Sequence, residues 1–261
     1  MSYEIKDHIV NIPLWRRVVS FLVFWFALAV VMVYDWAVFG LVVVGRRNLR
    51  GLRDRPCFLI SNHTLYLDPA LVGHAIAPLR TRFTALKKTF AIPFVGNLIR
   101  YLGAIPVPES NGLQRLLGPV RKLIDSGWCV HFFPEGDLKH RNQSPAVFSP
   151  GVFFFSQLLD RPIVPVTTVL LPRAILGREI SARFFRVKVV IGEPIDPAGF
   201  RTAGRGLRDS VEAMASYAHR IMCECIRAER ARYLPPGSAE VPRHAELRQD
   251  GDERIARPSN W

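Results

Sequence analysis

A histidine and an aspartate with four residues between them, His63 and Asp68, are the pair in this chain best suited to acid–base chemistry. They lie between an apolar, strand-like run at Cys57–Ile60 and an apolar, helix-like run at Ala70–Val72. A histidine at the end of a buried strand can act as a general base near neutral pH, and an aspartate one loop away can hold its other ring nitrogen in the correct tautomer. No serine, cysteine or threonine stands out beside the pair as a nucleophile. The pattern therefore predicts a base that acts directly on a substrate hydroxyl.

Both residues also have a purely structural interpretation. Asp68 followed by Pro69, just before an apolar run, is typical of a helix N-cap with proline in the first turn. The two roles of Asp68 are compatible, because one carboxylate oxygen can reach the histidine ring while the cap fixes the backbone. His63 taken alone is equally consistent with a core histidine whose hydrogen bonds are satisfied.

A second polar cluster, Val130–Asp137, ends another apolar strand-like run. The active sites of open α/β sheets gather at the carboxyl ends of strands, so this cluster favours the catalytic interpretation of His63. Glu135 and Gly136 are expected to form a turn there that presents a carboxylate and free backbone N–H groups.

The metal-ligating residue types do not predict a metal site. The spacing of His131, Glu135 and His140 matches no familiar site, and His131 is expected to pack inside its strand. The cysteines are interpreted as two small buried hydrophobes and a lone C-x-C on a helical stretch, all free thiols in a reducing cytoplasm: Cys57, Cys129, Cys223 and Cys225.

Short apolar runs alternate with helix-like runs from Arg55 onward. This alternation predicts an α/β fold with a mostly parallel sheet flanked by helices, preceded by an N-terminal membrane-associated helical segment. The expected strands are Cys57–Ser61, Phe83–Leu86, Ala104–Val107, Trp128–Phe133, Ile163–Leu171 and Phe184–Ile191. The expected helices are Pro69–Ala77, Phe94–Leu102, Leu113–Ser126, Val152–Leu159 and Leu207–Tyr233, the last carrying an amphipathic stripe that favours core packing.

The segment Val18–Val44 is almost wholly apolar, with Asp35 inside it. Its uninterrupted part, Val18–Tyr34, would extend about 26 Å as a helix, slightly less than the roughly 30 Å of a bilayer core. Arginines flank the segment on both sides, whereas a single span usually carries positive charge on one side. We therefore expect a re-entrant or interfacial helix pair that turns near Asp35, with a single span as the alternative. A cleaved signal peptide is not favoured, because the small-x-small pattern at Ala27–Ala29 lies inside the apolar run.

Three regions are expected: a membrane anchor at residues 1–50, a catalytic domain at residues 51–233 and a polar, disordered tail at residues 234–261. The tail from Leu234 holds four arginines and five acidic residues, so the rest of the chain carries one unit more than the net charge of +13. This basic balance predicts a polyanionic partner, and the apolar segment favours membrane lipids. We expect no nucleic-acid partner, since no groove-reading helix or basic-aromatic stripe is present.

Asn62-His63-x4-Asp68 together with Phe133–Gly136 resembles the glycerolipid acyltransferase family, of the 1-acylglycerol-3-phosphate acyltransferase type with its HX4D motif. The similarity runs from about residue 55 to residue 195. Supporting segments that resemble family motifs are Lys87-Lys88 with Ile92–Gly96, Gly103–Ile105, Phe148-x-x-Gly151 and Pro162–Val166.

The resemblance implies that His63 takes a proton from an acceptor hydroxyl while Asp68 orients the ring. The hydroxyl would then attack an acyl-CoA or acyl-carrier-protein thioester, with no covalent enzyme intermediate and no bound cofactor. By the same analogy, Glu135 and Gly136 would help to place the acceptor. Pro165 would lie near the donor site, although a proline at a strand edge or bulge is the structural alternative.

The chain departs from the family where phosphate-binding arginines are expected. Glu109 occupies the arginine position of the second motif, and Asp137-Leu138 replaces the usual Thr-Arg of the third. A glutamate would repel a phosphate that an arginine would hold. Two explanations follow: the acceptor is not lysophosphatidic acid, or other basic residues bind its phosphate, namely Lys87, Lys88, Lys139 or Arg141.

Two functions follow from the sequence. The first is a membrane acyltransferase of phospholipid biosynthesis, placed at the cytoplasmic face of the inner or plasma membrane. The alternative is a non-catalytic lipid-binding or scaffold protein on an acyltransferase fold, which the changes at Glu109 and Leu138 motivate. The presence of His63, Asp68 and Glu135 argues for the enzyme.

Overall fold

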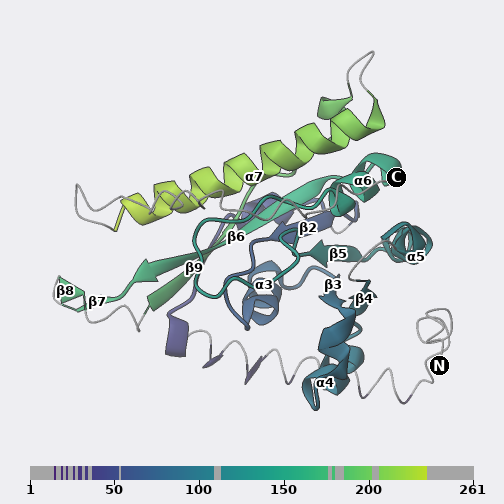
Figure 1. Ribbon diagram of the computed structural model, residues 1–261. Coiled ribbons are helices and arrows are strands. Elements are labelled where there is room, and N and C mark those ends of the chain that lie inside the picture. Colours follow the sequence, from purple (N-terminus) through teal and green to yellow (C-terminus); the bar gives the residue numbers. More distant parts are fainter. Residues whose placement is uncertain are drawn as a thin grey trace, which may run out of the picture.

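The computed structural model describes residues 40–52, 54–108, 113–175, 178–179, 185–201 and 206–233, together with scattered positions between residues 15 and 39. A seven-stranded sheet, in the order β1-β9-β6-β2-β5-β3-β4, forms its centre (Figure 1). The strands are β1 (Val42–Val44), β2 (Phe58–Ser61), β3 (Thr81–Leu86), β4 (Ile105–Val107), β5 (Cys129–Phe132), β6 (Ile163–Pro172) and β9 (Phe185–Ile191). All neighbouring pairs are parallel except β6 and β9. Two short strands, β7 (Ala174–Ile175) and β8 (Arg178–Glu179), form a separate antiparallel pair.

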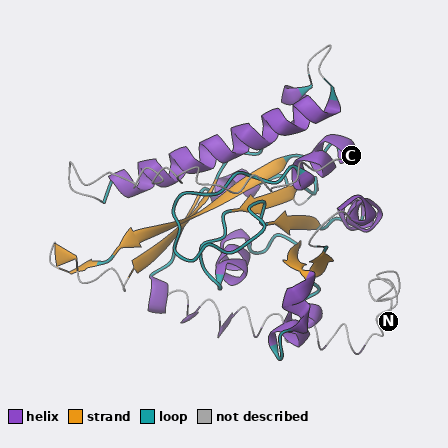
Figure 2. Ribbon diagram, viewed as in Figure 1, coloured by secondary structure: helices purple, strands orange, loops and turns teal. Residues whose placement is uncertain are grey.

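Helices cover both faces of this sheet, as Figure 2 shows. The α-helices are α3 (Asp68–Ile76), α4 (Val95–Tyr101), α5 (Leu117–Asp125), α6 (Gly151–Leu159) and α7 (Leu207–Ala231). The 3-10 segments are η1 (Arg46–Leu49), η2 (Lys87–Ala91), η3 (Leu113–Leu116) and η4 (Pro197–Phe200). The expected α/β fold with a mostly parallel, helix-flanked sheet is therefore confirmed.

The sheet separates two hydrophobic layers, and strand β2 contributes to both. Phe58 and Ile60 pack with α5, α6 and α7, whereas Leu59 and the preceding residue Cys57 pack with α3 on the other face. Because side chains alternate across a strand, a central strand buried on both faces must be apolar throughout. This explains the continuous apolar run that leads into Ser61 and the histidine motif.

The expected strands and helices are found with boundaries shifted by at most two residues at most ends. The predicted helix Leu113–Ser126 instead begins as the 3-10 turn η3 and becomes α-helical at Leu117. Strand β1 was not expected, because residues 42–44 read as the end of the membrane segment. These valines pair in parallel with Lys188–Val190 of β9 and form one edge of the sheet.

The described positions between residues 15 and 39 are helical, and all except Phe39 are exposed. No helix within the described part of the chain has the length and apolar character required to cross a bilayer. Asp35, Glu109 and the tail from residue 234 lie outside the described residues. The membrane segment therefore stays a prediction.

Pro165 lies where β6 is irregularly paired with the chain that follows β9. Ile163 forms a bridge with Ile195, and the regular ladder starts where Val166 pairs with Ile191. The segment that follows β9 therefore holds one more residue between these two pairs than β6 does. Gly192 donates its N–H to the Pro165 carbonyl oxygen at 2.8 Å. Because proline lacks an N–H, a bulge of this kind accommodates it without losing a ladder bond.

Candidate active site

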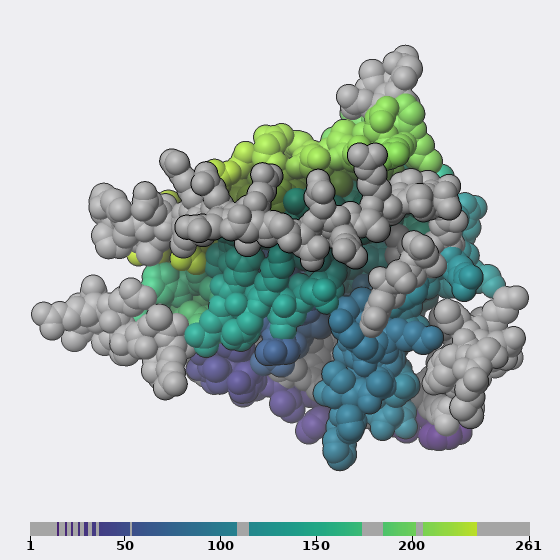
Figure 3. Space-filling view, viewed as in Figure 1, coloured from purple at the N-terminus to yellow at the C-terminus, as the bar shows by residue number. Residues whose placement is uncertain are grey.

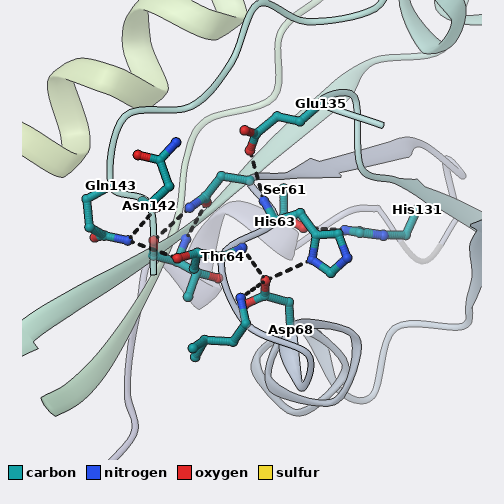
Figure 4. Close-up of polar contacts among 11 residues, drawn as sticks. Ser61, His63, Thr64, Asp68, His131, Glu135, Asn142 and Gln143 are labelled. Carbon is teal, nitrogen blue, oxygen red and sulfur yellow. Dashed lines mark hydrogen bonds and ion pairs between the residues drawn. The ribbon is translucent and has the colours of Figure 1, made fainter. Parts of the chain in front are cut away.

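His63 and Asp68 are in direct contact at the carboxyl end of β2 (Figure 4). The ring nitrogen Nδ1 of His63 lies 3.0 Å from Oδ2 of Asp68. The side chain of His63 is 19% exposed, whereas that of Asp68 is fully buried. Because Nδ1 faces the carboxylate, Nε2 is the nitrogen left to exchange a proton with a substrate. The expected base and its orienting carboxylate are thus brought together.

Asp68 does not cap the helix as the sequence suggested. It is the first residue of α3, the N-cap position belongs to Leu67, and that cap has no side-chain hydrogen bond. The Asp68 Oδ2 instead accepts the backbone N–H groups of Thr64 at 2.6 Å and Leu65 at 2.7 Å, both of which precede the helix. The carboxylate therefore closes the loop that carries His63.

Burial raises the pKa of the Asp68 carboxyl, and the hydrogen bonds from His63 and from the two backbone N–H groups oppose that rise. The second oxygen, Oδ1, is buried without a hydrogen-bond partner among the described residues. A proton on Oδ1 would therefore lack an acceptor there. Oδ2, in contrast, faces three hydrogen-bond donors, the His63 ring and two backbone N–H groups, which suit a carboxylate. This asymmetry favours the ionised form that can stabilise a protonated His63.

Glu135 holds the backbone of the histidine loop. Its Oε1 accepts the N–H of His63 at 2.9 Å, and its Oε2 accepts the N–H of Ala146 at 2.8 Å. Gly136 has a φ of +80° and donates its N–H to the Phe133 carbonyl oxygen at 3.1 Å. One of the N–H groups expected to be free at this turn, that of Gly136, is therefore already used, and both carboxylate oxygens of Glu135 are engaged within the protein.

Aromatic rings fix the other side of His63. Its ring stacks on Phe133 with centroids 4.1 Å apart and an angle of 23° between the planes. Phe133 in turn contacts the ring of His131. His131 is fully buried, and its Nε2 forms a 2.7 Å hydrogen bond with Ser61 Oγ. Burial lowers the pKa of His131 to about 3, so this histidine is neutral and packed, as expected.

Two of the four basic residues expected to bind a phosphate contact the histidine loop through their backbones, and the other two lie in η2. The backbone N–H of Lys139 donates to the His63 carbonyl oxygen and that of Arg141 to Thr64, so both residues run alongside the histidine loop. Lys88 forms an exposed ion pair of 3.4 Å with Asp137, and Lys87 is exposed beside it at the start of η2. The Arg141 guanidinium lies over the ring of Phe185 at 4.8 Å.

Two amide side chains with no predicted role complete the scaffold of the site. Asn62 donates to the Thr168 carbonyl oxygen and accepts the Thr168 N–H, at 2.9 and 2.8 Å. Gln143 accepts the Leu170 N–H at 2.8 Å. Strand β6 continues past the last residue of β2 that pairs with it, Ser61, so its outer backbone groups need partners. The difference in length between the ten-residue strand β6 and its four-residue neighbour β2 was the signal that could have predicted such side-chain partners.

Comparisons with known proteins agree with this geometry. The sequence model of the family described as "Acyltransferase" matches residues 40–169. A curated 1-acyl-sn-glycerol-3-phosphate acyltransferase of Bacillus subtilis (strain 168) is 26% identical over 165 residues, which cover 62% of this chain and 76% of the relative. The crystal structure of the 1-acyl-sn-glycerophosphate (LPA) acyltransferase PlsC from Thermotoga maritima superposes with a TM-score of 0.59 at 21% identity, covering 84% of this chain and 83% of that one. This last similarity supports the fold.

Proposed function

The chain belongs to the glycerolipid acyltransferase family, and we propose that it moves a fatty acyl group from an acyl thioester to the hydroxyl of a lysophospholipid or related lipid at a membrane surface. The contact between His63 Nδ1 and the buried Asp68 carboxylate carries the proposal. It leaves a partly exposed base at the end of a rigid strand, which is the group that O-acylation of a hydroxyl requires.

In the proposed reaction, His63 Nε2 removes the proton from the acceptor hydroxyl as its oxygen attacks the thioester carbonyl carbon. The resulting imidazolium is stabilised by the Asp68 carboxylate through Nδ1. When the tetrahedral intermediate collapses, the carbon–sulfur bond breaks and the proton on Nε2 passes to the departing thiolate. The products are an ester and a free thiol, and the enzyme returns to its starting state.

We assign Glu135 as a positioning residue, because its two oxygens hold the backbone of His63 and Ala146. The acceptor headgroup is assigned to the basic residues beside the loop. Lys139 and Arg141 run alongside His63 and Thr64, and Lys88 joins the same region through Asp137. The donor is acyl-CoA or acyl-carrier protein. The N-terminal segment would hold the enzyme at the cytoplasmic face of the inner or plasma membrane.

The test is transfer of a labelled acyl chain by the full-length protein, with acyl-CoA and acyl-carrier protein as separate donors and lysophosphatidic acid and a total lipid extract as separate acceptors. We expect turnover with at least one combination, and a loss on the order of 10²- to 10⁴-fold in His63→Ala with membrane association unchanged. Full activity in His63→Ala would overturn the general-base role. Saturable lipid binding without turnover of any acceptor would favour the non-catalytic scaffold instead.

A further inference from the structure

An exposed apolar surface lies on α4 and on the turn that joins it to η2, within the connection from β3 to β4 at the edge of the sheet. These residues form part of the blue lobe that projects from the lower part of the space-filling view (Figure 3). We call it the α4 surface. Its side chains and their exposed fractions are Ile92 (49%), Phe94 (89%), Val95 (43%), Leu98 (45%) and Tyr101 (53%).

The backbone beneath the α4 surface is tightly built, so the exposure of these side chains does not come from loose packing. Gly96 is buried, and a Cβ at this position would collide with the carbonyl oxygen of Phe90. Arg100 donates from Nη2 to the same oxygen at 2.8 Å and places its guanidinium over the Phe90 ring. The short helix is thereby fastened to η2 while its apolar residues point away from the core.

Phe94 adds a conformational cost to that exposure. It precedes α4 with a φ of +60° and a ψ of −52°, a region that side chains with a Cβ rarely adopt. Such a backbone typically costs about 1–3 kcal/mol, and the 89% exposed ring regains little of it through packing inside the protein. A glycine would form the same turn without the cost. A strained, exposed aromatic residue of this kind points to a contact outside the protein.

The charges around the α4 surface indicate which partner it suits. The stretch from Lys87 to Tyr101 contains three basic residues and no acidic residue, and Lys87, Lys88 and Arg100 are all exposed. Basic residues beside apolar side chains suit a bilayer with anionic lipids, in which the rings enter the interface and the cations meet the headgroups. Lys88 also contacts Asp137, two residues beyond Glu135, so η2, which precedes the α4 surface, adjoins the turn whose Glu135 binds the His63 backbone.

We propose that the α4 surface docks onto an anionic lipid bilayer, with Phe94 in the interfacial layer, as a membrane contact distinct from the N-terminal segment. The proposal deepens the proposed function, because it places a lipid surface next to the catalytic loop. A lipid acceptor could then reach His63 from the bilayer without first dissolving in water.

The first experiment measures where position 94 lies. Phe94→Trp and the control Leu207→Trp are made in the full chain and compared with the wild type, which has five tryptophans. Leu207 is 44% exposed at the start of α7, on the opposite side of the molecule from α4 (Figure 1). With vesicles of phosphatidylglycerol and brominated phosphatidylcholine, the added emission of Phe94→Trp should shift to the blue and be quenched. The added emission of Leu207→Trp should not. Equal behaviour of the two variants would overturn the proposal.

The second experiment measures the consequence for turnover. Leu98→Asp should lower the rate with an acceptor embedded in anionic vesicles by about tenfold, while leaving the rate with a short-chain, monomeric acceptor unchanged. Leu207→Asp, which makes the same change at a similarly exposed leucine, should alter neither rate.

An equal loss with both acceptors in Leu98→Asp would indicate a folding defect. In that case, vesicle binding by Phe94→Gly tests the proposal. That variant relieves the backbone strain, so it should keep its Tm and still bind vesicles about tenfold more weakly. Unchanged vesicle binding by Phe94→Gly would overturn the proposal.

Two further outcomes separate this inference from its alternatives. If acidic acyl-carrier protein, but not vesicles, changes the emission of Phe94→Trp, the surface binds the carrier and the membrane proposal is overturned. If no acceptor is acylated at all, the proposed enzymatic function fails. Tryptophan quenching would still determine whether the α4 surface contacts lipid.

Discussion

The backbone N–H of His63 donates to Glu135 Oε1 across 2.9 Å, although 72 positions separate the two residues in the chain. The catalytic loop after β2 and the turn after β5 are therefore connected through the main chain of the base itself. Glu135 binds a second backbone group, at Ala146, with its other oxygen. A carboxylate used in this way is expected to control the position of the base and to contribute little to acceptor affinity.

Replacement of Glu135 tests this role. Glu135→Ala removes both backbone contacts and should lower kcat by roughly 10- to 100-fold, equivalent to about 1.5–3 kcal/mol, because these hydrogen bonds involve a charged acceptor. Glu135→Gln keeps one acceptor oxygen and should lose less. The KM for the acceptor should change little in either variant. Steady-state kinetics at varied acceptor concentration measure both quantities, and a rise in KM at constant kcat would show that Glu135 binds the acceptor instead.

Replacement of Asp68 should separate activity from stability. Burial raises the pKa of Asp68 above its usual 3.8, so ionisation of this carboxyl lowers the stability of the folded state as the pH rises from 3.8 through the folded-state pKa. Asp68→Asn removes the charge while retaining an oxygen that can accept the loop N–H groups. We expect kcat to fall on the order of 10²- to 10⁴-fold at pH 7, whereas the Tm should change little, because the removal of a buried charge offsets the cost of amide N–H groups that lack an acceptor at the Oδ1 position.

The comparison of Tm values across pH provides the control for Asp68→Asn. Below pH 3.8 the carboxyl is protonated in both the folded and unfolded states, so any stability advantage of the variant over the wild type should disappear there. A large loss of stability in the variant at pH 7 would show that the negative charge holds the loop together.

His131 should weaken the protein as the pH falls. Its pKa is lowered to about 3 in the folded state from the usual 6.5, so between these values the unfolded chain binds a proton that the folded protein does not. The wild type should therefore lose up to about 1.4 kcal/mol of unfolding free energy per pH unit through this residue. The double variant Ser61→Ala/His131→Leu removes the buried hydrogen-bonded pair together and should lack this contribution. Urea unfolding from pH 7 to pH 4 measures the difference, and parallel pH profiles would contradict the prediction.

Gln143 should contribute to the stability of the fold. Gln143→Ala leaves the Leu170 N–H without its acceptor and should reduce the free energy of unfolding by about 1–3 kcal/mol. Gln143→Glu retains the acceptor oxygen but loses the donation from Nε2 to the Asn142 carbonyl oxygen, so it separates the two contacts and should lose less stability than Gln143→Ala. Denaturant unfolding compares the two variants. Equal stability of Gln143→Ala and wild type would mean that water or a neighbouring group replaces the amide.

Lys139 tests whether the acceptor carries a phosphate near the loop. Its side chain is exposed, and its backbone N–H binds the His63 carbonyl oxygen. Lys139→Gln should reduce kcat/KM for a phosphate-bearing acceptor by about tenfold and leave a phosphate-free acceptor unaffected. Lys122→Gln, an exposed lysine on α5, is the control. Equal losses with both acceptors would place the role of Lys139 elsewhere than at the phosphate.

The sequence predicted the elements that carry the site more completely than the contacts within it. Alternating apolar runs located β2 and β5, and the two motifs at their ends indicated His63, Asp68 and Glu135. The partners of these side chains depend on long-range geometry: Asp68 followed by proline has the same local pattern whether it caps its helix or binds the preceding loop. The three valines of β1 were missed because a short run of valine is equally apolar in a sheet edge and in a membrane segment.

Asn62 and His63 are adjacent, yet their roles differ. Asn62 completes the hydrogen bonding of β6, whereas His63 is the proposed base. The requirement for a paired sheet and the requirement for a catalytic base thus fall on adjacent residues for independent reasons. A lineage that lost the reaction would still be expected to retain Asn62, and drift at position 63 beside an unchanged asparagine would mark such a descendant.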